Sequence, residues 1–450
     1  MLEFVNGILG GAVPCALMGT GLYFLAKLKF LPITKFYKPL RAQRKNGGGS
    51  FRALALSLAG TLGVGNIVGV ASAIYSGGLG AIFWMWVSAA VAAVLKYSEI
   101  VLAMRHRTTV SGGFKGGAPY YIRDCLSRHF PALGVAVASL FALLCAANCF
   151  SMGAVMQTNT VAEAFFEAFG AKRQFCGIAV ALLTLIVTLG GAKRIMRLTS
   201  ALVPFMSLVY VLLSLLVIVP RYRQLPAVFS EIFASAFTAK GVVGGAGGFL
   251  FSRALRFGVM RGLFSNEAGC GTSPTAHISS NSQPCEQGFM GIFEVFIDTV
   301  LLCTMTAFVL ALGGGEIGES PMRSVISAYS SSFSPPFGRA IEVLMALMVL
   351  CFGFATVSCL AHYALECIGF LFKRVPRALF ALAYSAVAFI GASVSSDAAW
   401  AVSDATVGVM TLINLAVLLL SRKEIADETA LYFDCDKNIS KFDKKFTKCS

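Results

Sequence analysis

A few acidic and amide side chains stand inside long apolar stretches of this 450-residue chain. Glu294 and Asp298 are four residues apart, which places them one turn apart on the same face of a helix. They could pass a proton between them, and a structural network with backbone amides or with Arg261 explains the pair equally well. Glu267 follows Arg261 closely and is expected to pair with a nearby arginine rather than to bind a ligand. Gln157 is a lone amide, which favours contact with a bound solute over a hydrogen bond that only joins helices.

Residues that enzymes use for metal binding or nucleophilic catalysis are scattered along the chain. The four histidines stand at positions 106, 129, 277 and 362, and none of the 13 cysteines forms a C-x-x-C motif. Cys145 and Cys149 share a helix face and could bind a soft metal, but cysteine in an apolar segment usually acts as a small hydrophobic residue. The pattern predicts no resident cofactor and argues against an enzyme. A channel would need a repeated pore-lining element, and the sequence shows none.

The composition is that of a membrane protein. Hydrophobic residues make up 57% of the chain and charged residues 13%, whereas soluble domains carry about 25% charge. Apolar windows of roughly 17–25 residues recur, and in lipid such windows must be helical because nothing else pairs their backbone amides. The strand-like alternation of an outer-membrane barrel is missing. We therefore predict an all-α polytopic membrane protein with about eleven transmembrane helices. They are expected near Gly7–Phe30, Ala53–Tyr75, Ala81–Ala103, Leu133–Phe166, Phe175–Gly191, Leu198–Val219, Gly241–Gly271, Gly288–Leu312, Ala340–Phe372, Ala378–Val394 and Trp400–Leu420.

The net charge of +15 is spread over alternate connections between these spans rather than gathered in one nucleic-acid-binding patch. Lys35, Lys38 and Arg41 follow the first span, and Arg105 and Arg107 follow the third. By the positive-inside rule, these connections face the cytoplasm. This predicts a multi-pass protein of the cytoplasmic (inner) membrane with its N-terminus outside and its C-terminus inside. The first span has no basic residue before it, so we interpret it as a retained helix and not a cleaved signal peptide.

The chain divides into one membrane domain with two flanking segments. Residues 1–52 are expected to form an accessory transmembrane helix and a basic segment on the inner membrane surface. Residues 53–421 are expected to form the transporter core. The tail, residues 422–450, mixes Lys and Asp without helical periodicity and is expected to be flexible.

Two of the predicted spans are poor helices by composition. Ala53–Tyr75 carries Gly60, Gly63, Gly65 and Gly69 around Asn66, and Gly241–Gly271 is richer still in glycine. Close helix packing through small residues explains isolated glycines, but glycine clustered with amides, hydroxyls and a carboxylate suits a broken helix that binds solutes. With the first span set aside, these two open two sets of five spans. Interrupted helices in corresponding positions of two halves indicate a transporter site between inverted repeats.

The motifs in and around these spans resemble the alanine/glycine:cation symporter family. The resemblance runs from about residue 48 to residue 421, and the S-N-E-A-G run at 265–269 is its most specific part. The matching runs are Gly49–Leu54, Gly63–Ala71, Gly77–Trp86, Glu99, 116–121, Gln157–Asn159, Arg261–Gly269, Phe296–Thr299, Asp404 and Asn414–Leu415.

The resemblance implies a LeuT-like fold of five plus five inverted repeats, with the substrate held between the second and seventh spans. Freed amides would hold a carboxylate, and freed carbonyls with Gln157 would accept the protons of an ammonium group. Phe264 is then either a lid over the site or ordinary packing, and Asn66 either a ligand or a cap of the broken helix. The expected substrate residues are Thr61, Gly63, Val64, Gly65, Asn66, Gln157, Phe264, Ser265 and Asn266.

The same resemblance places a sodium ion near carbonyls of Ala59 and Leu62 and the hydroxyl of Thr356. The sequence departs from the family pattern at Val64, where a hydroxyl residue is usual, and at Ala355, where a serine commonly precedes the residue kept as Thr356. Leu79 replaces a proline, and Ala364-Leu365 replace the usual Gly-Glu.

The expected function is sodium-coupled symport of alanine, glycine or a similar small neutral amino acid into the cell by alternating access. The alternative is a proton-coupled or altered-substrate transporter of the same fold, which the departures at Val64 and Ala355 motivate. The expected partners are the amino acid, the sodium ion and the lipid bilayer, with no nucleic acid.

Overall fold

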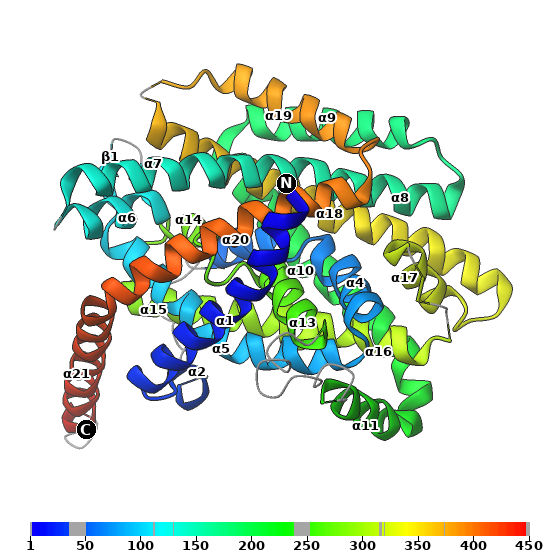
Figure 1. Cartoon of the computed structure of the whole chain (residues 1–450), viewed down its shortest axis with the longest axis horizontal. Helices are drawn as coiled ribbons and strands as arrows, with labels where there is room; N and C mark the ends of the chain where they lie inside the picture. The colour runs from blue at the N-terminus through cyan, green and yellow to red at the C-terminus, as the bar shows by residue number, and fades with distance from the viewer. Residues whose placement is uncertain are drawn as a thin grey trace.

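The computed structural model describes residues 2–35, 51–110, 113–128, 130–237, 253–314, 317–318, 320–372 and 374–446. In these residues the regular secondary structure is helical except for one short antiparallel hairpin, in which Thr108 pairs with Lys115 (Figure 1). Most of the predicted basic interfacial segment lies outside the described residues, at 36–50.

The helices and strands follow one another in a simple order along the chain. They are α1 (Leu2–Lys27), α2 (Leu31–Thr34), an unlabelled helix over Phe51–Thr61, η1 (Val64–Asn66), α4 (Val68–Gly77), α5 (Gly80–Arg105), β1 (Thr108–Val110), β2 (Gly113–Lys115), α6 (Ala118–Ser127), α7 (Pro131–Asn148), η2 (Cys149–Met156), α8 (Gln157–Phe169), α9 (Arg173–Leu189), α10 (Gly191–Ile218), η3 (Val219–Gln224), α11 (Leu225–Ala236), α13 (Arg253–Asn266), α14 (Pro274–His277), α15 (Pro284–Val295), η5 (Phe296–Cys303), α16 (Thr304–Leu312), α17 (Pro321–Ser330), α18 (Pro335–Leu371), α19 (Arg377–Gly391), α20 (Ser396–Leu420) and α21 (Arg422–Phe446).

The apolar helices match the predicted spans one for one. Seven described helices are long and apolar enough to cross a membrane, and one bent pair makes an eighth. The shorter apolar helices α9 and α19 and the helix α13 fall on the remaining three predicted spans. Two of the spans, α7–η2–α8 and α15–η5–α16, contain a π-helical stretch in the middle. In a π-helix the backbone bonds five residues back instead of four, which widens the turn, and such stretches are frequent at functional sites.

Both glycine-rich spans are interrupted. The first one bends by 57° between Phe51–Thr61 and Val64–Gly77. The second leaves its helix at Asn266, where Glu267 takes a positive φ of 52°. Gly269 and Gly271 follow with φ of 92° and 79°, a region that costs glycine little. The N-terminal part of this span, up to residue 252, lies outside the described residues.

The helices pack as two groups that meet at the first break. In one group, α5 lies against α13, α15 and α1; in the other, α18 lies against α7, α8 and α10. The shorter helices α9 and α19 lie side by side along the edge of the second group (Figure 1). The broken span runs between the groups, and its first half contacts α18 through the Thr356 hydroxyl, which donates to the carbonyl of Ala59 at 2.8 Å.

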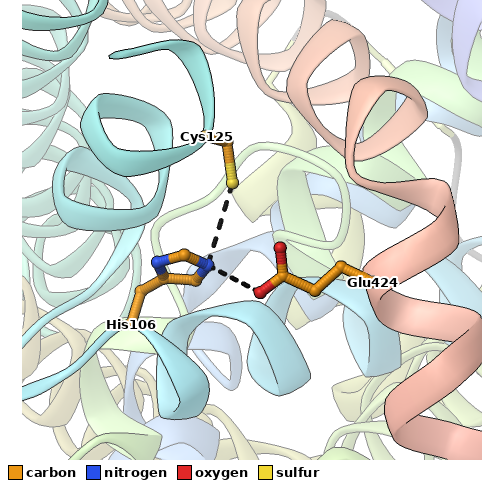
Figure 2. Close-up of side chains that lie close together, drawn as sticks. All are labelled: His106, Cys125 and Glu424. Atoms are coloured by element: carbon orange, nitrogen blue, oxygen red, sulfur yellow. Dashed lines mark hydrogen bonds and ion pairs between the residues drawn. The ribbon is translucent and has the colours of Figure 1, made fainter. Parts of the chain in front are cut away.

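The segment after residue 421 differs from the prediction of a flexible tail. It forms the helix α21, which leaves the membrane domain at the end where α5 ends (Figure 1). Glu424 in its first turn binds Arg128 at 2.7 Å and the Nε2 of His106 at 2.9 Å (Figure 2). Periodicity in the sequence did not indicate this helix, because its attachment depends on charged groups from distant parts of the chain.

The charges around His106 explain why it can hold the helix. Its other ring nitrogen lies 3.1 Å from Asp124. Partial burial opposes the charged form, but the hydrogen bonds with Asp124 and Cys125 and the charge of Glu424 raise the pKa of His106 to about 10. Burial alone would raise the pKa of the Asp124 and Glu424 carboxyls. Hydrogen bonds from His106 and Arg123 lower the pKa of Asp124 instead, and Arg128 and His106 lower the pKa of Glu424. The imidazole is therefore an imidazolium at neutral pH.

Candidate functional site

The first break lies against Gln157, the first residue of α8. The side-chain oxygen of Gln157 accepts the backbone N–H of Val64 at 3.1 Å, and its Nε2 donates to the carbonyl of Met152 at 3.2 Å. Gly63 fits between α8 and α18: a Cβ there would lie 2.7 Å from the Thr356 hydroxyl oxygen and 2.9 Å from the Gln157 side-chain oxygen. The structure thus brings the predicted amide, the predicted break and the predicted sodium hydroxyl together around one glycine.

The sodium candidates come from two helices: Ala59 lies in the last turn of the first half-helix with Leu62 just after it, and Thr356 lies in α18. Besides Ala59, the Thr356 hydroxyl lies 3.1 Å from the carbonyl of Phe352 in its own helix. Leu62 is fully buried and directly precedes Gly63. Carbonyl and hydroxyl oxygens are the ligands that a hard cation prefers, so these residues offer suitable chemistry. The neighbouring Ala355 is fully buried and supplies no oxygen from its side chain.

Phe264 closes one side of the first break. Its ring lies 3.3 Å from where a Cβ on Gly65 would stand, and it stacks at a tilt on Trp400 of α20, with 4.4 Å between ring centroids. Arg261 covers Trp400 with its guanidinium 3.9 Å from the ring centroid and binds Asp404 through two hydrogen bonds of 3.0 and 2.9 Å. Phe264 is only 2% exposed. Aromatic packing and an ion pair therefore seal this side of the break.

The prediction that Glu267 pairs with an arginine is wrong. Its carboxylate accepts a hydrogen bond from the Thr272 hydroxyl at 2.6 Å within the same loop, and Arg261 forms its ion pair with Asp404. The positive φ of Glu267 turns the chain back on itself at the end of α13, so its side chain stays with the loop that follows.

Asp298 gathers the polar side chains of the two breaks. Its carboxylate accepts Asn66 Nδ2 at 2.7 Å, the Ser265 hydroxyl at 2.9 Å and the Thr299 hydroxyl at 2.7 Å. Thr299 in turn accepts from Asn266 Nδ2 at 3.1 Å. The side-chain oxygen of Asn66 is buried and has no hydrogen-bond partner among the described residues. Asn66 therefore joins the two breaks and still presents one free acceptor.

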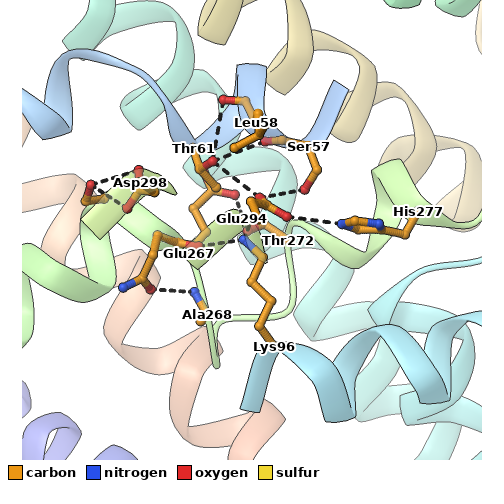
Figure 3. Close-up of polar contacts among 12 residues, drawn as sticks. Ser57, Leu58, Thr61, Lys96, Glu267, Ala268, Thr272, His277, Glu294 and Asp298 are labelled. Carbon is orange, nitrogen blue, oxygen red and sulfur yellow. Dashed lines mark hydrogen bonds and ion pairs between the residues drawn. The ribbon is translucent and has the colours of Figure 1, made fainter. Parts of the chain in front are cut away.

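Glu294, one turn earlier, belongs to a different network (Figure 3). It accepts the hydroxyls of Ser57 at 2.7 Å and Thr61 at 3.3 Å, and it pairs with Lys96 at 2.7 Å and with His277 at 3.2 Å. Thr61, predicted as a substrate residue, thus faces this carboxylate. The two carboxylates have different partners, and these partners meet at Asn266, whose carbonyl accepts from Lys96 and whose side-chain amide donates to Thr299. Arg261 pairs with Asp404 instead.

Lys96 is the part of the site that reading the sequence missed. It stands within the predicted span Ala81–Ala103. A lysine at membrane depth is by itself a functional signal, and that rule would have found it. Cys145 and Cys149 do not belong to any group of metal ligands in the described part of the chain; the one such group there is His106, Cys125 and Glu424 (Figure 2). Arginines surround that group, and ion pairs account for its geometry.

Two interrupted helical spans inside an all-helical membrane domain define the LeuT-like fold. Two solved structures share this architecture. A Na⁺-coupled sialic acid symporter is 14% identical with a TM-score of 0.57, covering 92% of this chain and 86% of that one. A manganese transporter of Eremococcus coleocola is 15% identical with a TM-score of 0.54, covering 82% and 76%.

The chain belongs to the sodium:alanine symporter family, whose model matches residues 1–447. It is 33% identical to the sodium/alanine symporter AgcS of Methanococcus maripaludis, over 98% of both chains. It is 35% identical to an uncharacterized transporter of Haemophilus influenzae, over 96% of both chains. It is also 33% identical to a probable sodium/glutamine symporter, GlnT, of Bacillus subtilis, over 90% of this chain and 84% of that one. The family resemblance seen in the motifs is confirmed.

Proposed function

We propose that this transporter carries alanine, glycine or a similar small neutral amino acid into the cell together with sodium, by alternating access. The observation that carries the proposal is the meeting of Gln157, the first break and Thr356 around Gly63. There the Val64 N–H and the Gln157 amide suit an amino acid, and the nearby oxygens of Leu62 and Thr356 suit sodium. Coupling of the two solutes needs such neighbouring sites.

The amide of Val64 is the natural donor for the substrate carboxylate. In the structure Gln157 accepts this N–H at 3.1 Å, so a bound carboxylate would take the place of the Gln157 oxygen. That oxygen would then be free to accept a proton from the substrate ammonium. A zwitterion needs both partners, since an unpaired charge is costly in a low-dielectric site.

The size of the substrate follows from what surrounds the break. The space at the break exists because Gly63 and Gly65 have no side chains. The Phe264 ring lies against Gly65 and packs on Trp400. Alanine and glycine suit such a site, and a long side chain would have to displace the Phe264 ring.

Sodium is proposed as the coupling ion, held by the carbonyls of Ala59 and Leu62 and the hydroxyl of Thr356. The name of the AgcS relative supports sodium and alanine. The position of the ion beside the break supports coupling, because its charge would favour the entry of the substrate carboxylate. The protein is further proposed to lie in the cytoplasmic membrane with its N-terminus outside.

Proton coupling or another substrate is the second candidate. Val64 and Ala355 remove two hydroxyls that the family pattern usually places near the substrate and the ion. One relative, YrbD of Bacillus subtilis, is named as a putative sodium/proton-dependent alanine carrier, and GlnT is named for glutamine.

Uptake of radiolabelled alanine into proteoliposomes tests the proposal. The purified protein is given an inward sodium gradient, then an inward proton gradient without sodium. Accumulation of alanine that needs sodium supports the proposal. Accumulation driven by protons alone would contradict sodium coupling, and no alanine uptake with either ion would contradict the substrate. Glutamine in the same assay then distinguishes the substrate of the second candidate.

A further inference from the structure

A buried ion pair lies next to the proposed substrate and sodium residues without belonging to them. Lys96 of α5 and Glu294 of α15 have fully buried side chains, and 2.7 Å separates Nζ from Oε1. Both residues stand within apolar membrane-spanning helices. Charges at such depth are expensive to bury, and well-packed apolar residues often stabilise a core at least as well. Packing alone therefore does not account for the pair, and its contacts point to a further role.

The contacts of the pair reach both helix breaks. The Lys96 ammonium also donates to the backbone carbonyl of Asn266 at 2.7 Å, the residue where α13 ends. On the other side, Glu294 accepts the hydroxyls of Ser57 and Thr61 in the last turns of the first half-helix. One short chain of contacts thus runs from the end of one half-helix to the end of the other (Figure 3).

The remaining oxygen of Glu294 fixes the orientation of its carboxylate. It faces His277 Nε2 at 3.2 Å, and His277 Nδ1 lies 2.7 Å from the side-chain nitrogen of Gln287. Since that amide donates to Nδ1, Nε2 of a neutral imidazole carries the hydrogen that Glu294 accepts. The carboxylate is held from three directions and cannot turn away from the first break without losing buried partners.

The two ends that the pair joins have different proposed roles. Thr61 directly precedes Leu62, whose carbonyl is a proposed sodium ligand. Asn266 and the preceding Ser265 are expected substrate residues at the end of α13. A shift of one break caused by the ion is therefore transmitted to the other through Lys96 and Glu294.

We propose that Lys96 and Glu294 are positioning residues that couple sodium binding at the first break to the expected substrate residues Ser265 and Asn266 at the second break. The inference rests on the proposed function and adds the residues that link its two sites. Neither side chain contacts the ion or the amino acid; both act by fixing one break relative to the other.

The test uses the double variant Lys96→Met with Glu294→Gln, which removes both charges, keeps similar side-chain volumes and leaves no unpaired buried charge. Alanine binding to the purified full-length protein is measured without sodium and over a series of sodium concentrations. For the wild type, sodium is expected to tighten alanine binding roughly tenfold or more, in the usual range of coupling between two sites. For the double variant, this sodium effect should fall to about twofold or less.

Tyr97→Phe is the matched control. Tyr97 is buried on the same helix as Lys96 and bonds to Thr429 at 3.0 Å, away from both breaks. Its loss removes a buried hydrogen bond and should leave the sodium effect on alanine binding unchanged. Ser57→Ala keeps the ion pair but removes one of its contacts with the first break. It should also lower the sodium effect on alanine binding, and it takes the place of the double variant if that variant does not fold.

The outcomes separate this inference from the proposed function. A wild type whose alanine binding ignores sodium would contradict the proposed function and the inference together. A wild type with a clear sodium effect that the double variant, or Ser57→Ala in its place, fully retains would overturn the role of the pair alone.

Discussion

At the scale of single residues, the side-chain amide of Gln157 is central to the proposed substrate site. It accepts from Val64 and donates to Met152, and the Val64 N–H is the proposed donor to the substrate carboxylate. The sequence indicated Gln157 as a lone amide in an apolar span. It could not indicate that this amide accepts the backbone N–H of Val64 at the break.

Gln157→Ala should reduce alanine uptake by about tenfold to a hundredfold. The variant loses a hydrogen bond to a charged group, which contributes about 1.5–3 kcal/mol. The measurement is initial uptake rate against alanine concentration. Asn159→Ala is the control: this amide stands two residues further along α8 and donates to the carbonyls of Gly391 and Val394. Asn159→Ala should lower the stability of the protein more than it changes the KM for alanine. Equal losses of uptake in both variants would contradict a substrate role for Gln157.

Gly63→Ala should abolish sodium-dependent uptake. The added methyl would stand 2.7 Å from the Thr356 hydroxyl oxygen and 2.9 Å from the Gln157 side-chain oxygen, so the break would have to shift. Gly69→Ala lies in the same span with no atom within 4 Å of the new Cβ. It should transport normally and be slightly more stable, since alanine favours a helix interior by about 1 kcal/mol. Thermal unfolding of both purified variants checks that the loss is not one of folding.

At the scale of helices, most of the fold was predictable and the networks were not. Lipid forces every apolar window into a helix, so the spans followed from length and hydropathy, and glycine clusters located both breaks. Lys96 was missed because an average over an apolar window hides one lysine. The pairing of Arg261 with Asp404 joins residues far apart in sequence, and no local pattern shows which helices become neighbours. The helix α21 was missed for the same reason.

The attachment of α21 should depend on pH. His106 has a pKa raised to about 10, so its contribution is complete below its ordinary value near 6.5 and lost as pH rises through about 10. Asp124 and Glu424 have lowered pKa values, so their contribution is present above their ordinary values and lost as pH falls through the lowered ones. The protection factors of the α21 amides against hydrogen exchange, taken relative to the intrinsic exchange rate at each pH, should therefore be highest in mildly acidic solution and lower at both extremes. Glu424→Gln should lower protection throughout; unchanged protection would contradict the role of these ion pairs.

At the scale of the whole molecule, the orientation in the membrane is still a prediction from basic residues. Lys423→Cys, at the start of α21, should face the cytoplasm, and Arg339→Cys, at the start of α18, should face outward. A membrane-impermeant maleimide applied to intact cells should label the second variant above the parent protein and leave the first unlabelled until the cells are opened. The reverse pattern would contradict the proposed topology.

The π-helical stretch η2, Cys149–Met156, ends directly before Gln157. Successive residues of an α-helix are rotated by about 100° around its axis, so a wide turn changes the angular phase of everything that follows. The two halves of this span therefore belong to different helical registers, and Gln157 faces the break only because the register changes just before it. A relative with one residue fewer in this stretch would present a neighbour of Gln157 to the substrate. In this family, a one-residue gap here would mean a changed binding site and not a harmless shortening.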